Sequence, residues 1–291
     1  MKKKEQVQKK QLPKVVIAET EYETADIEAT ANILFKPNPG PQTAFLAASE
    51  REVLYGGSAG GGKSYAMLAD PLRYMGHPQF SGLLLRHTTE ELRELIFKSQ
   101  ELYPKIWPGI KWSERKMQWT APSGARLWMS YLDRDDDVLR YQGLAFSWIG
   151  FDELTQWSSS YAWNYMRSRL RSTAPDLPIF MRATTNPGGR GHSWVKKTFI
   201  DPSPYDKSFD ATDTDTAEVL RYPAGHIKAG KPLFKRRFIP ARLSDNPYLS
   251  EGGDYEAMLL SLPEQQRRQL LEGDWDIKEG AAFTELNRDI H

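Results

Sequence analysis

The sequence predicts an α/β fold with a central, mostly parallel sheet flanked by helices. Short apolar runs typical of buried strands alternate with stretches in which apolar residues repeat at helical spacing, and this alternation favours strand-helix units. A glycine-rich loop at residues 57–64 joins one such strand to one such helix, which supports the same fold class. The length of 291 residues suits one large domain with an added subdomain.

The first elements follow from local patterns in chain order. Residues 1–35 are largely polar, with blocks of like charge, so we expect a flexible N-terminal arm. Proline and glycine at 37–41 mark the start of the folded body. A strand at 52–55 and a helix at 64–74, bent at Pro71, come next.

The middle of the chain adds strands and one capped helix. Thr88 and Glu91 form a capping box, which predicts a helix that begins at this point. A turn at 122–124 lies between two apolar runs and predicts a hairpin. The strands expected in this region are 83–85, 118–120, 126–131, 146–151 and 179–183.

The last third of the chain differs in composition. From about residue 201 the sequence is rich in Asp, Pro and Gly, and it then becomes helical over 254–271. We interpret this shift as a boundary between a core at 36–200 and a smaller lid subdomain at 201–275.

Composition excludes several classes of protein. The 39 Lys and Arg balance 38 Asp and Glu, so any nucleic-acid contact must come from local patches. The chain has no cysteine, which excludes disulfides, thiolate metal sites and cysteine nucleophiles. It also lacks an apolar stretch of about 18 residues and a signal-peptide core, so we expect no membrane partner and a cytoplasmic protein that is not secreted.

The loop at 57–64, GSAGGGKS, matches the phosphate-binding pattern G-x-x-x-x-G-K-[ST]. Lys63 would hold the β- and γ-phosphates of ATP, and the Ser64 hydroxyl would bind Mg²⁺. The alternative is a flexible glycine turn that happens to precede Lys-Ser. The residues whose backbone N–H groups would surround the phosphates are Gly57, Ser58, Ala59, Gly60, Gly61 and Gly62.

Polar residues follow two predicted strands. Asp152 would bind Mg²⁺, and Glu153 would act as the general base that polarises a water molecule. Such an acidic pair can also simply cap a turn. Thr185 and Asn186 end the next strand, where they would contact the γ-phosphate or the water; a plain turn is the open alternative.

Several ordered motifs together resemble the large terminase subunit of tailed bacteriophages. Besides the glycine loop, these are DELTQW at 152–157, TTNPG at 184–188, SDNPYL at 244–249 and LEGDW at 271–275. The resemblance implies an additional-strand P-loop ATPase with a lid, which uses ATP to translocate double-stranded DNA into a procapsid. It assigns the Walker A role to Lys63 and Ser64, the acidic roles to Asp152 and Glu153, the coupling motif to Thr185 and Asn186, and adenine contact to Gln42.

The resemblance also implies partners. These are double-stranded DNA, a portal protein and a small terminase subunit, with the chain forming a homo-oligomeric ring when assembled, a monomer alone, and docking on the procapsid in the host cytoplasm. Family members continue into a nuclease, whereas this sequence ends at His291, so residues 276–291 would begin the linker and no DNA cleavage is expected. The alternative function is a helicase-like or switch-type P-loop ATPase outside packaging.

The glycine loop carries no arginine, so the charge that would face the γ-phosphate must come from elsewhere. Arg140 is the candidate for a finger donated to a neighbouring subunit, and its alternative role is a salt bridge within the acidic run 135–137. Arg86 is the next candidate. The candidate DNA contacts are the basic clusters at 167–171, 196–197 and 235–237, although clusters of this kind are more often a solvated surface.

Overall fold

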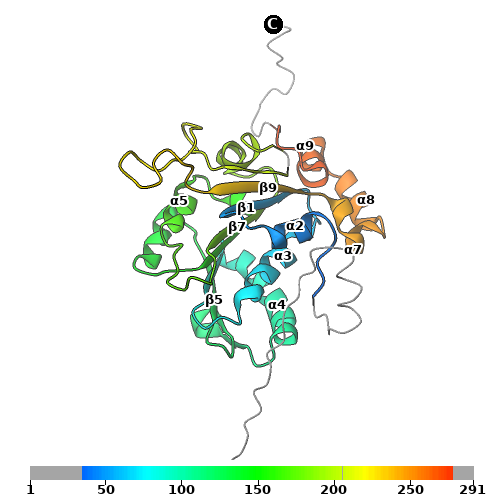
Figure 1. Cartoon of the computed structure of the whole chain (residues 1–291). Coiled ribbons are helices and arrows are strands. Elements are labelled where there is room, and N and C mark those ends of the chain that lie inside the picture. The colour runs from blue at the N-terminus through cyan, green and yellow to red at the C-terminus, as the bar shows by residue number, and fades with distance from the viewer. Residues whose placement is uncertain (1–34, 205, 278–291) are drawn as a thin grey trace, which may run out of the picture.

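The structure, a computed structural model, describes residues 35–204 and 206–277. One sheet runs through the described ranges, with the strand order β3-β4-β5-β2-β6-β7-β1-β9-β8 (Figure 1). Its strands are β1 (Glu52–Gly57), β2 (Ser81–Arg86), β3 (Lys111–Ser113), β4 (Gln118–Thr120), β5 (Arg126–Tyr131), β6 (Trp148–Asp152), β7 (Phe180–Thr185), β8 (Ser208–Asp210) and β9 (Lys235–Ala241).

The central strands confirm the predicted parallel sheet. Neighbours from β5 to β9 pair in parallel, and the edge strands β3, β4 and β8 are attached by antiparallel pairing. Strand β7 lies between β1 and β6, which is the additional strand that the resemblance implied. The hairpin expected from the turn at 122–124 is confirmed as β4 and β5.

Helices cover both faces of the sheet. Figure 1 shows α2, α3 and α4 on one side and α5 on the other. The helices of the described part of the chain are α2 (Pro41–Ala47), α3 (Lys63–Ala69), α4 (Thr89–Ile106), α5 (Tyr161–Arg167), α6 (His192–Val195), α7 (Pro247–Ser250), α8 (Asp254–Leu260) and α9 (Glu264–Arg267), with 3-10 turns at 70–74, 114–116, 135–141, 154–156 and 243–245 and π-helical turns at 196–200 and 268–272.

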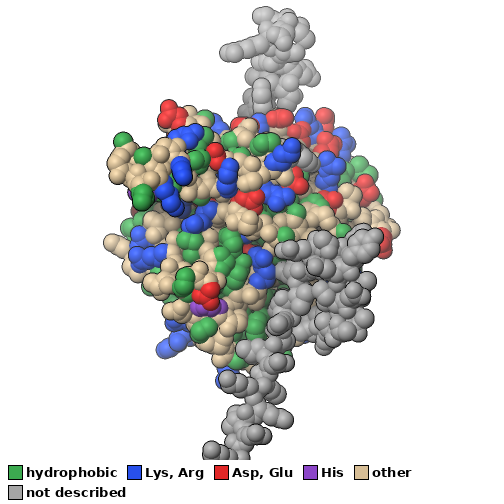
Figure 2. Space-filling view, viewed as in Figure 1, with side chains coloured by type: hydrophobic (Ala, Val, Ile, Leu, Met, Phe, Trp, Pro, Cys, Tyr) green, Lys and Arg blue, Asp and Glu red, His purple; other side chains and the backbone are tan. Residues whose placement is uncertain are grey.

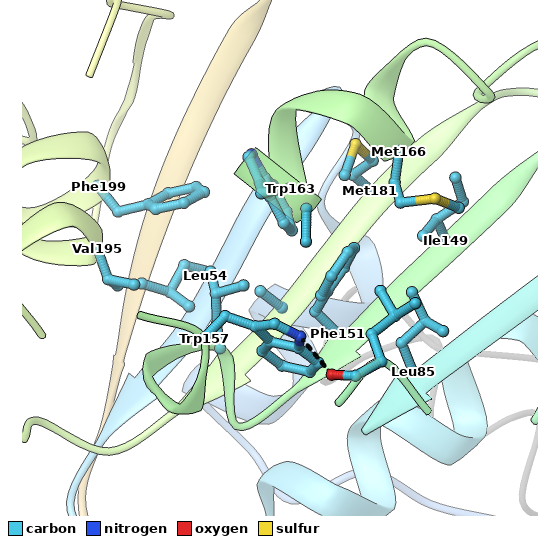
Figure 3. Close-up of a cluster of buried hydrophobic side chains, with 14 of the residues drawn as sticks. Leu54, Leu85, Ile149, Phe151, Trp157, Trp163, Met166, Met181, Val195 and Phe199 are labelled. Atoms are coloured by element: carbon cyan, nitrogen blue, oxygen red, sulfur yellow. Dashed lines mark hydrogen bonds between the residues drawn. The ribbon is translucent and has the colours of Figure 1, made fainter. Parts of the chain in front are cut away.

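Side-chain alternation along the strands builds a separate core on each face. Leu83 and Leu85 of β2 join the core beneath α5 and α6, whereas Leu84 joins the core beneath α3 and α4. Figure 3 shows the first core, in which Phe151 packs near Trp157 and Trp163. The indole Nε1 of Trp157 donates a hydrogen bond of 3.1 Å to a backbone carbonyl, so this polar atom is satisfied inside an apolar cluster.

Two local predictions can be compared with the structure. The capping box is confirmed, because Thr88 accepts the N–H of Glu91 and the Glu91 carboxylate accepts the N–H of Thr88. The helix expected at 64–74 is α-helical only to Ala69 and continues as a 3-10 turn. Pro71 lies in that turn, where its missing N–H and fixed φ disfavour continued α-helix.

The last third of the chain contributes two strands to the sheet as well as helices α7 to α9. Strand β9 pairs in parallel with β1 and β8 pairs with β9, so both strands belong to the same sheet as the glycine loop. Helices α7 to α9 follow in the orange-to-red segment of Figure 1, where α7 packs against α8. The predicted arm at 1–35 and the predicted linker at 276–291 lie outside the described residues, apart from residues 35, 276 and 277. No helix in the described ranges is long and apolar enough to span a membrane.

Candidate nucleotide site

The glycine loop connects β1 to α3 and depends on glycine at particular positions. Gly57 has φ 138°, and a Cβ there would lie 2.3 Å from the Ala241 carbonyl oxygen. Gly62 has φ 76°, and a Cβ there would lie 2.7 Å from Nε2 of Gln42. L-residues rarely adopt these φ values, so both positions favour glycine, and at Gly57 the backbone of β9 also closes the space.

The carboxyl ends of β1, β6 and β7 meet at one edge of the sheet because these strands are parallel. Asp152, at the end of β6, pairs in register with Thr184 of β7, whose hydroxyl donates a hydrogen bond to Oδ1 of Asp152. On the other side of β6, Nε of Arg86 lies 3.1 Å from Oδ2 of Asp152. Asp152 is 1% exposed, so these two groups set its orientation.

Lys63 begins α3 and is buried in the loop. Its Nζ donates a hydrogen bond of 2.6 Å to the backbone carbonyl of Ser58. Burial lowers the pKa of the Lys63 ammonium, while the nearby carboxylates of Glu153 and Asp152 act in the opposite direction. The ammonium is thus placed between the loop backbone and two acids, as expected for a group that would hold phosphate charge.

Glu153 follows β6 in an unusual backbone conformation. Its φ of 60° and ψ of 58° place a non-glycine residue in the left-handed region, which is a sparsely populated conformation that is often found at functional sites. The backbone N–H of Asn186 donates a hydrogen bond of 3.3 Å to Oε2 of Glu153. Burial, followed by the neighbouring Asp152, raises the pKa of the Glu153 carboxyl, although Lys63 and Arg86 act against this. A raised pKa suits a carboxylate that accepts a proton from water.

The structure brings Thr185 and Asn186 to the same edge by different contacts. The hydroxyl of Thr185 lies 2.7 Å from the hydroxyl of Thr155 and accepts the Thr155 N–H at 3.2 Å. Thr185 therefore fixes the turn after β6, whereas Asn186 contacts Glu153 directly through its backbone. The Asn186 side-chain oxygen is buried and has no hydrogen-bond partner among the described residues. Contact of either residue with a γ-phosphate stays a prediction.

Side chains far apart in the sequence hold the carbonyl groups of the loop. Nε2 of Gln42 donates to the Gly62 carbonyl at 2.9 Å, and Nδ2 of Asn246 donates to the Gly60 carbonyl at 2.6 Å. Asn38 links the two, because its N–H donates to Oε1 of Gln42 at 2.6 Å and its Nδ2 donates to Oδ1 of Asn246 at 3.3 Å. In this structure Gln42 thus contacts the loop itself, and adenine contact stays a prediction.

The segment after β9 packs directly on the loop. The N–H of Ala59 donates a hydrogen bond of 2.6 Å to the carbonyl of Leu270, and the N–H of Leu243 donates one of 3.0 Å to Oγ of Ser58. At Gly273, with φ 67°, a Cβ would lie 2.8 Å from the Ser58 nitrogen. Residues 243–273 therefore contact the glycine loop through backbone as well as side-chain atoms. A movement of this segment would change the hydrogen bonds that it makes with the loop.

The two candidate arginines occupy different places. Arg140 is 46% exposed, and its Nη2 lies 3.1 Å from Oδ2 of Asp137 and 3.1 Å from the Tyr131 carbonyl. The salt bridge that the sequence offered as the alternative is therefore formed, and donation of Arg140 to a neighbouring subunit stays a prediction. Arg86, the second candidate, lies inside the site against Asp152.

Sequence reasoning missed two residues of the site. Thr184 is the first of these, because the sequence does not show the strand register that places it, rather than Thr185, opposite Asp152. Asn246 lies within the SDNPYL motif at 244–249, but nothing in the sequence showed that its amide reaches the loop. An asparagine directly before a proline at a helix start was the available signal.

Comparison with known proteins identifies the family. No curated protein matches this chain. The family model described as phage terminase large subunit matches residues 49–221.

Solved structures share the fold at low sequence identity. The large terminase of a thermophilic bacteriophage superposes with a TM-score of 0.59 at 15% identity, covering 86% of this chain and 57% of that protein. A complex of the same terminase with ADP gives a TM-score of 0.54 at 15% identity, covering 81% of this chain and 52% of that chain. A mutant ATPase domain from the large terminase of a Thermus phage gives 0.51 at 12% identity, covering 80% of this chain and 92% of that domain.

The chain therefore spans little more than half the length of the thermophilic phage's terminase, and at these identities the likeness establishes the shared fold. The family match extends over more than half of the sequence and includes the glycine loop and both acidic residues. On this evidence the chain belongs to the family of phage terminase large subunits.

Proposed function

We propose that this chain is the ATP-hydrolysing part of a motor that translocates double-stranded viral DNA into a procapsid. The observation that carries the proposal is the gathering of buried Lys63, buried Asp152 and partly buried Glu153 at one sheet edge, with a raised pKa at Glu153. A cation and two acids held there at low solvent exposure match the needs of phosphoryl transfer to water.

The chain's own residues have separable roles. The backbone N–H groups of the glycine loop and the Lys63 ammonium would bind the β- and γ-phosphates, and Lys63 would exchange its bond to the Ser58 carbonyl for phosphate oxygens. Glu153 would orient the attacking water and accept its proton, since its carboxylate is held by the Asn186 N–H. In this structure the N–H groups of Ser58 and Ala59 donate to the carbonyls of Ala241 and Leu270, so the other N–H groups of the loop would make the phosphate contacts.

Ser64 and Asp152 fit the binding of Mg²⁺. Mg²⁺ in nucleotide sites is held by one or two protein oxygens together with phosphates and water. Apart from its ion pair with Arg86, Oδ2 of Asp152 is buried without a hydrogen-bond partner among the described residues. Phosphate oxygens of the nucleotide and water molecules would complete the coordination. Bound Mg²⁺ would supply positive charge to the phosphates.

The partners follow from the proposed motor. The chain would form a homo-oligomeric ring on the portal protein of a procapsid in the host cytoplasm, with a small terminase subunit delivering the DNA. We expect the isolated chain to be a monomer and a slow ATPase, and we expect turnover to rise upon ring assembly, when a neighbouring subunit can supply a further positive charge.

The test separates nucleotide binding from hydrolysis. Lys63→Ala is expected to abolish ATP binding, measured by titration calorimetry, because the buried ammonium is lost. Glu153→Gln is expected to keep ATP binding while turnover falls about 10² to 10⁴-fold, the usual contribution of a general base. Glu94→Gln, a carboxylate that is 62% exposed on α4, is the matched control. Asp152→Asn is expected to raise the Mg²⁺ concentration needed for turnover.

Two results would contradict the proposal. Retained turnover in the Glu153→Gln variant would remove the assignment of the base. Failure of portal-loaded procapsids to protect DNA from nuclease digestion when supplied with active chain, ATP and the small subunit would remove packaging, while leaving the ATPase assignment in place.

A further inference from the structure

A basic ribbon projects from the sheet edge formed by β8 and β9. We define it as residues 219–233, whose two arms are paired by an Arg221–Pro232 bridge. The N–H of Tyr222 donates a hydrogen bond of 3.0 Å to the Lys231 carbonyl, and the N–H of Gly230 donates one of 3.0 Å to the Tyr222 carbonyl. Figure 1 shows this segment as the yellow loop that extends beyond the body of the molecule near α5. Ile227 at its tip is 96% exposed, so the tip stands clear of the core.

The ribbon carries positive charge without acidic residues. No Asp or Glu occurs between Glu218 and Asp245, and within this interval the ribbon contains Arg221, Lys228 and Lys231. All three cations are exposed, and none forms a salt bridge among the described residues. Figure 2 shows Lys and Arg side chains gathered over this part of the surface. The ribbon thus presents a concentration of unneutralised charge.

By contrast, four of the five cations in the basic clusters at 196–197 and 235–237 pair with acids among the described residues, whereas in the cluster at 167–171 Arg167 alone does so. Lys235 pairs with Asp210 at 2.7 Å, and Arg237 pairs with Asp206 at 2.9 Å. Arg236 is buried against Glu52, and Lys196 pairs with Asp276 at 2.8 Å. A phosphate would have to displace these acids, so the clusters at 196–197 and 235–237 are weaker candidates for DNA contact than the ribbon.

The tip of the ribbon is ordered by its own side chains. The rings of Tyr222 and His226 stack with centroids 4.5 Å apart, and Nζ of Lys228 lies 5.7 Å from the Tyr222 ring centroid. Nδ1 of His226 accepts the N–H of Lys228 at 3.0 Å. Positioning the cations in advance lowers the entropy that binding must remove.

We propose that the basic ribbon contacts the phosphate backbone of the double-stranded DNA that the motor moves. This proposal rests on the proposed function. The B-DNA major groove admits a two-stranded ribbon, and Lys and Arg at such a position meet phosphates on its edges. A motor that moves any sequence needs contacts of this kind, because phosphate contacts carry no sequence information. Lysine is depleted from protein interfaces, which favours DNA over a protein partner.

The experiment measures how the affinity of the full chain for a labelled DNA duplex depends on salt, by fluorescence anisotropy. The test variant combines Arg221→Gln, Lys228→Gln and Lys231→Gln. The slope of log K against log salt is negative, and each lost phosphate contact reduces its magnitude by about 0.9. For three lost contacts we expect the magnitude to fall by about 2 to 3. We also expect at least a tenfold weaker affinity at about 0.1 M salt.

The matched control removes the same charge elsewhere, through Lys105→Gln, Lys111→Gln and Lys116→Gln, three exposed residues near the opposite end of the sheet. The control is expected to change the slope by less than about 0.5, since it alters only the net charge. Melting temperatures of both variants report that the fold is kept.

The outcomes separate the ribbon from the proposed function. An unchanged slope in the ribbon variant, while the wild-type chain binds DNA, overturns the ribbon proposal alone. Equal losses in the ribbon and control variants also overturn it, because net charge then explains the effect. Absence of DNA binding by the wild-type chain counts against the packaging function, and the ribbon proposal falls with it.

Discussion

Replacing Glu52 with alanine is expected to destabilise the sheet that carries the phosphate loop. Glu52 begins β1 and is fully buried, with Oε2 2.7 Å from Nε of Arg236 and Oε1 bonded to Arg167. Its Cα is the register partner of Arg236 on β9, which is itself 1% exposed. Removing the carboxylate leaves the Arg236 guanidinium buried with only the Thr212 carbonyl, at 2.6 Å, still accepting from it among the described residues.

The magnitude follows from burial. Breaking a buried ion pair by removing one partner costs about 3 to 5 kcal/mol. For a domain of this size each kcal/mol lowers Tm by about 2 to 4 °C, so Glu52→Ala is expected to lower Tm by about 6 to 20 °C. The control is Glu94→Ala. Oε1 of Glu94 lies 2.5 Å from Nζ of Lys98 in an ion pair at the surface. Exposed pairs contribute about 0 to 1 kcal/mol, so its Tm is expected to fall by less than about 4 °C.

Calorimetry and circular dichroism measure both variants, and pH provides a second readout. Burial acts to raise the pKa of Glu52, but Arg236 and Arg167 outweigh it and hold that pKa below 4.5. A lowered pKa in the folded state contributes stability above pH 4.5, which is lost as the pH falls through the folded value. Glu52→Gln is expected to remove this dependence. Equal Tm losses for Glu52→Ala and Glu94→Ala would refute the assignment of the buried pair.

Three further predictions concern the nucleotide site. Asn246→Ala frees the Gly60 carbonyl and is expected to raise KM for ATP several-fold with a smaller change in kcat; an unchanged KM would show that the amide does not position the loop. The acid limb of kcat/KM is expected above pH 4.5, because the pKa of Glu153 is raised and its carboxylate must be ionised; a limb below 4.5 would exclude Glu153 as the base. Mixed rings of Arg140→Ala and Glu153→Gln subunits are expected to recover part of the ATPase activity if the finger acts in trans. If assembled rings recover none, Arg86→Ala is the next variant to measure.

The sequence alone determined the elements whose signals are local. The glycine loop, the capping box at Thr88 and the hairpin turn depend on residues a few positions apart, and all three are present in the structure. Apolar runs located the buried strands for the same reason, because burial on both faces excludes polar side chains. Asp152 and Glu153 were found because they end such a run.

Only the tertiary structure decided which of these elements are neighbours. A strand pattern records burial but not register, so the contact of Thr184 with Asp152 and the pairing of β9 with β1 could not be predicted. For the same reason, only the structure shows that Arg86 lies against Asp152 and that Asn246 contacts the loop at Gly60, 186 residues away in the sequence. These contacts arise from the sheet order, which is fixed by burying both cores at once and by pairing buried charges such as Glu52 and Arg236.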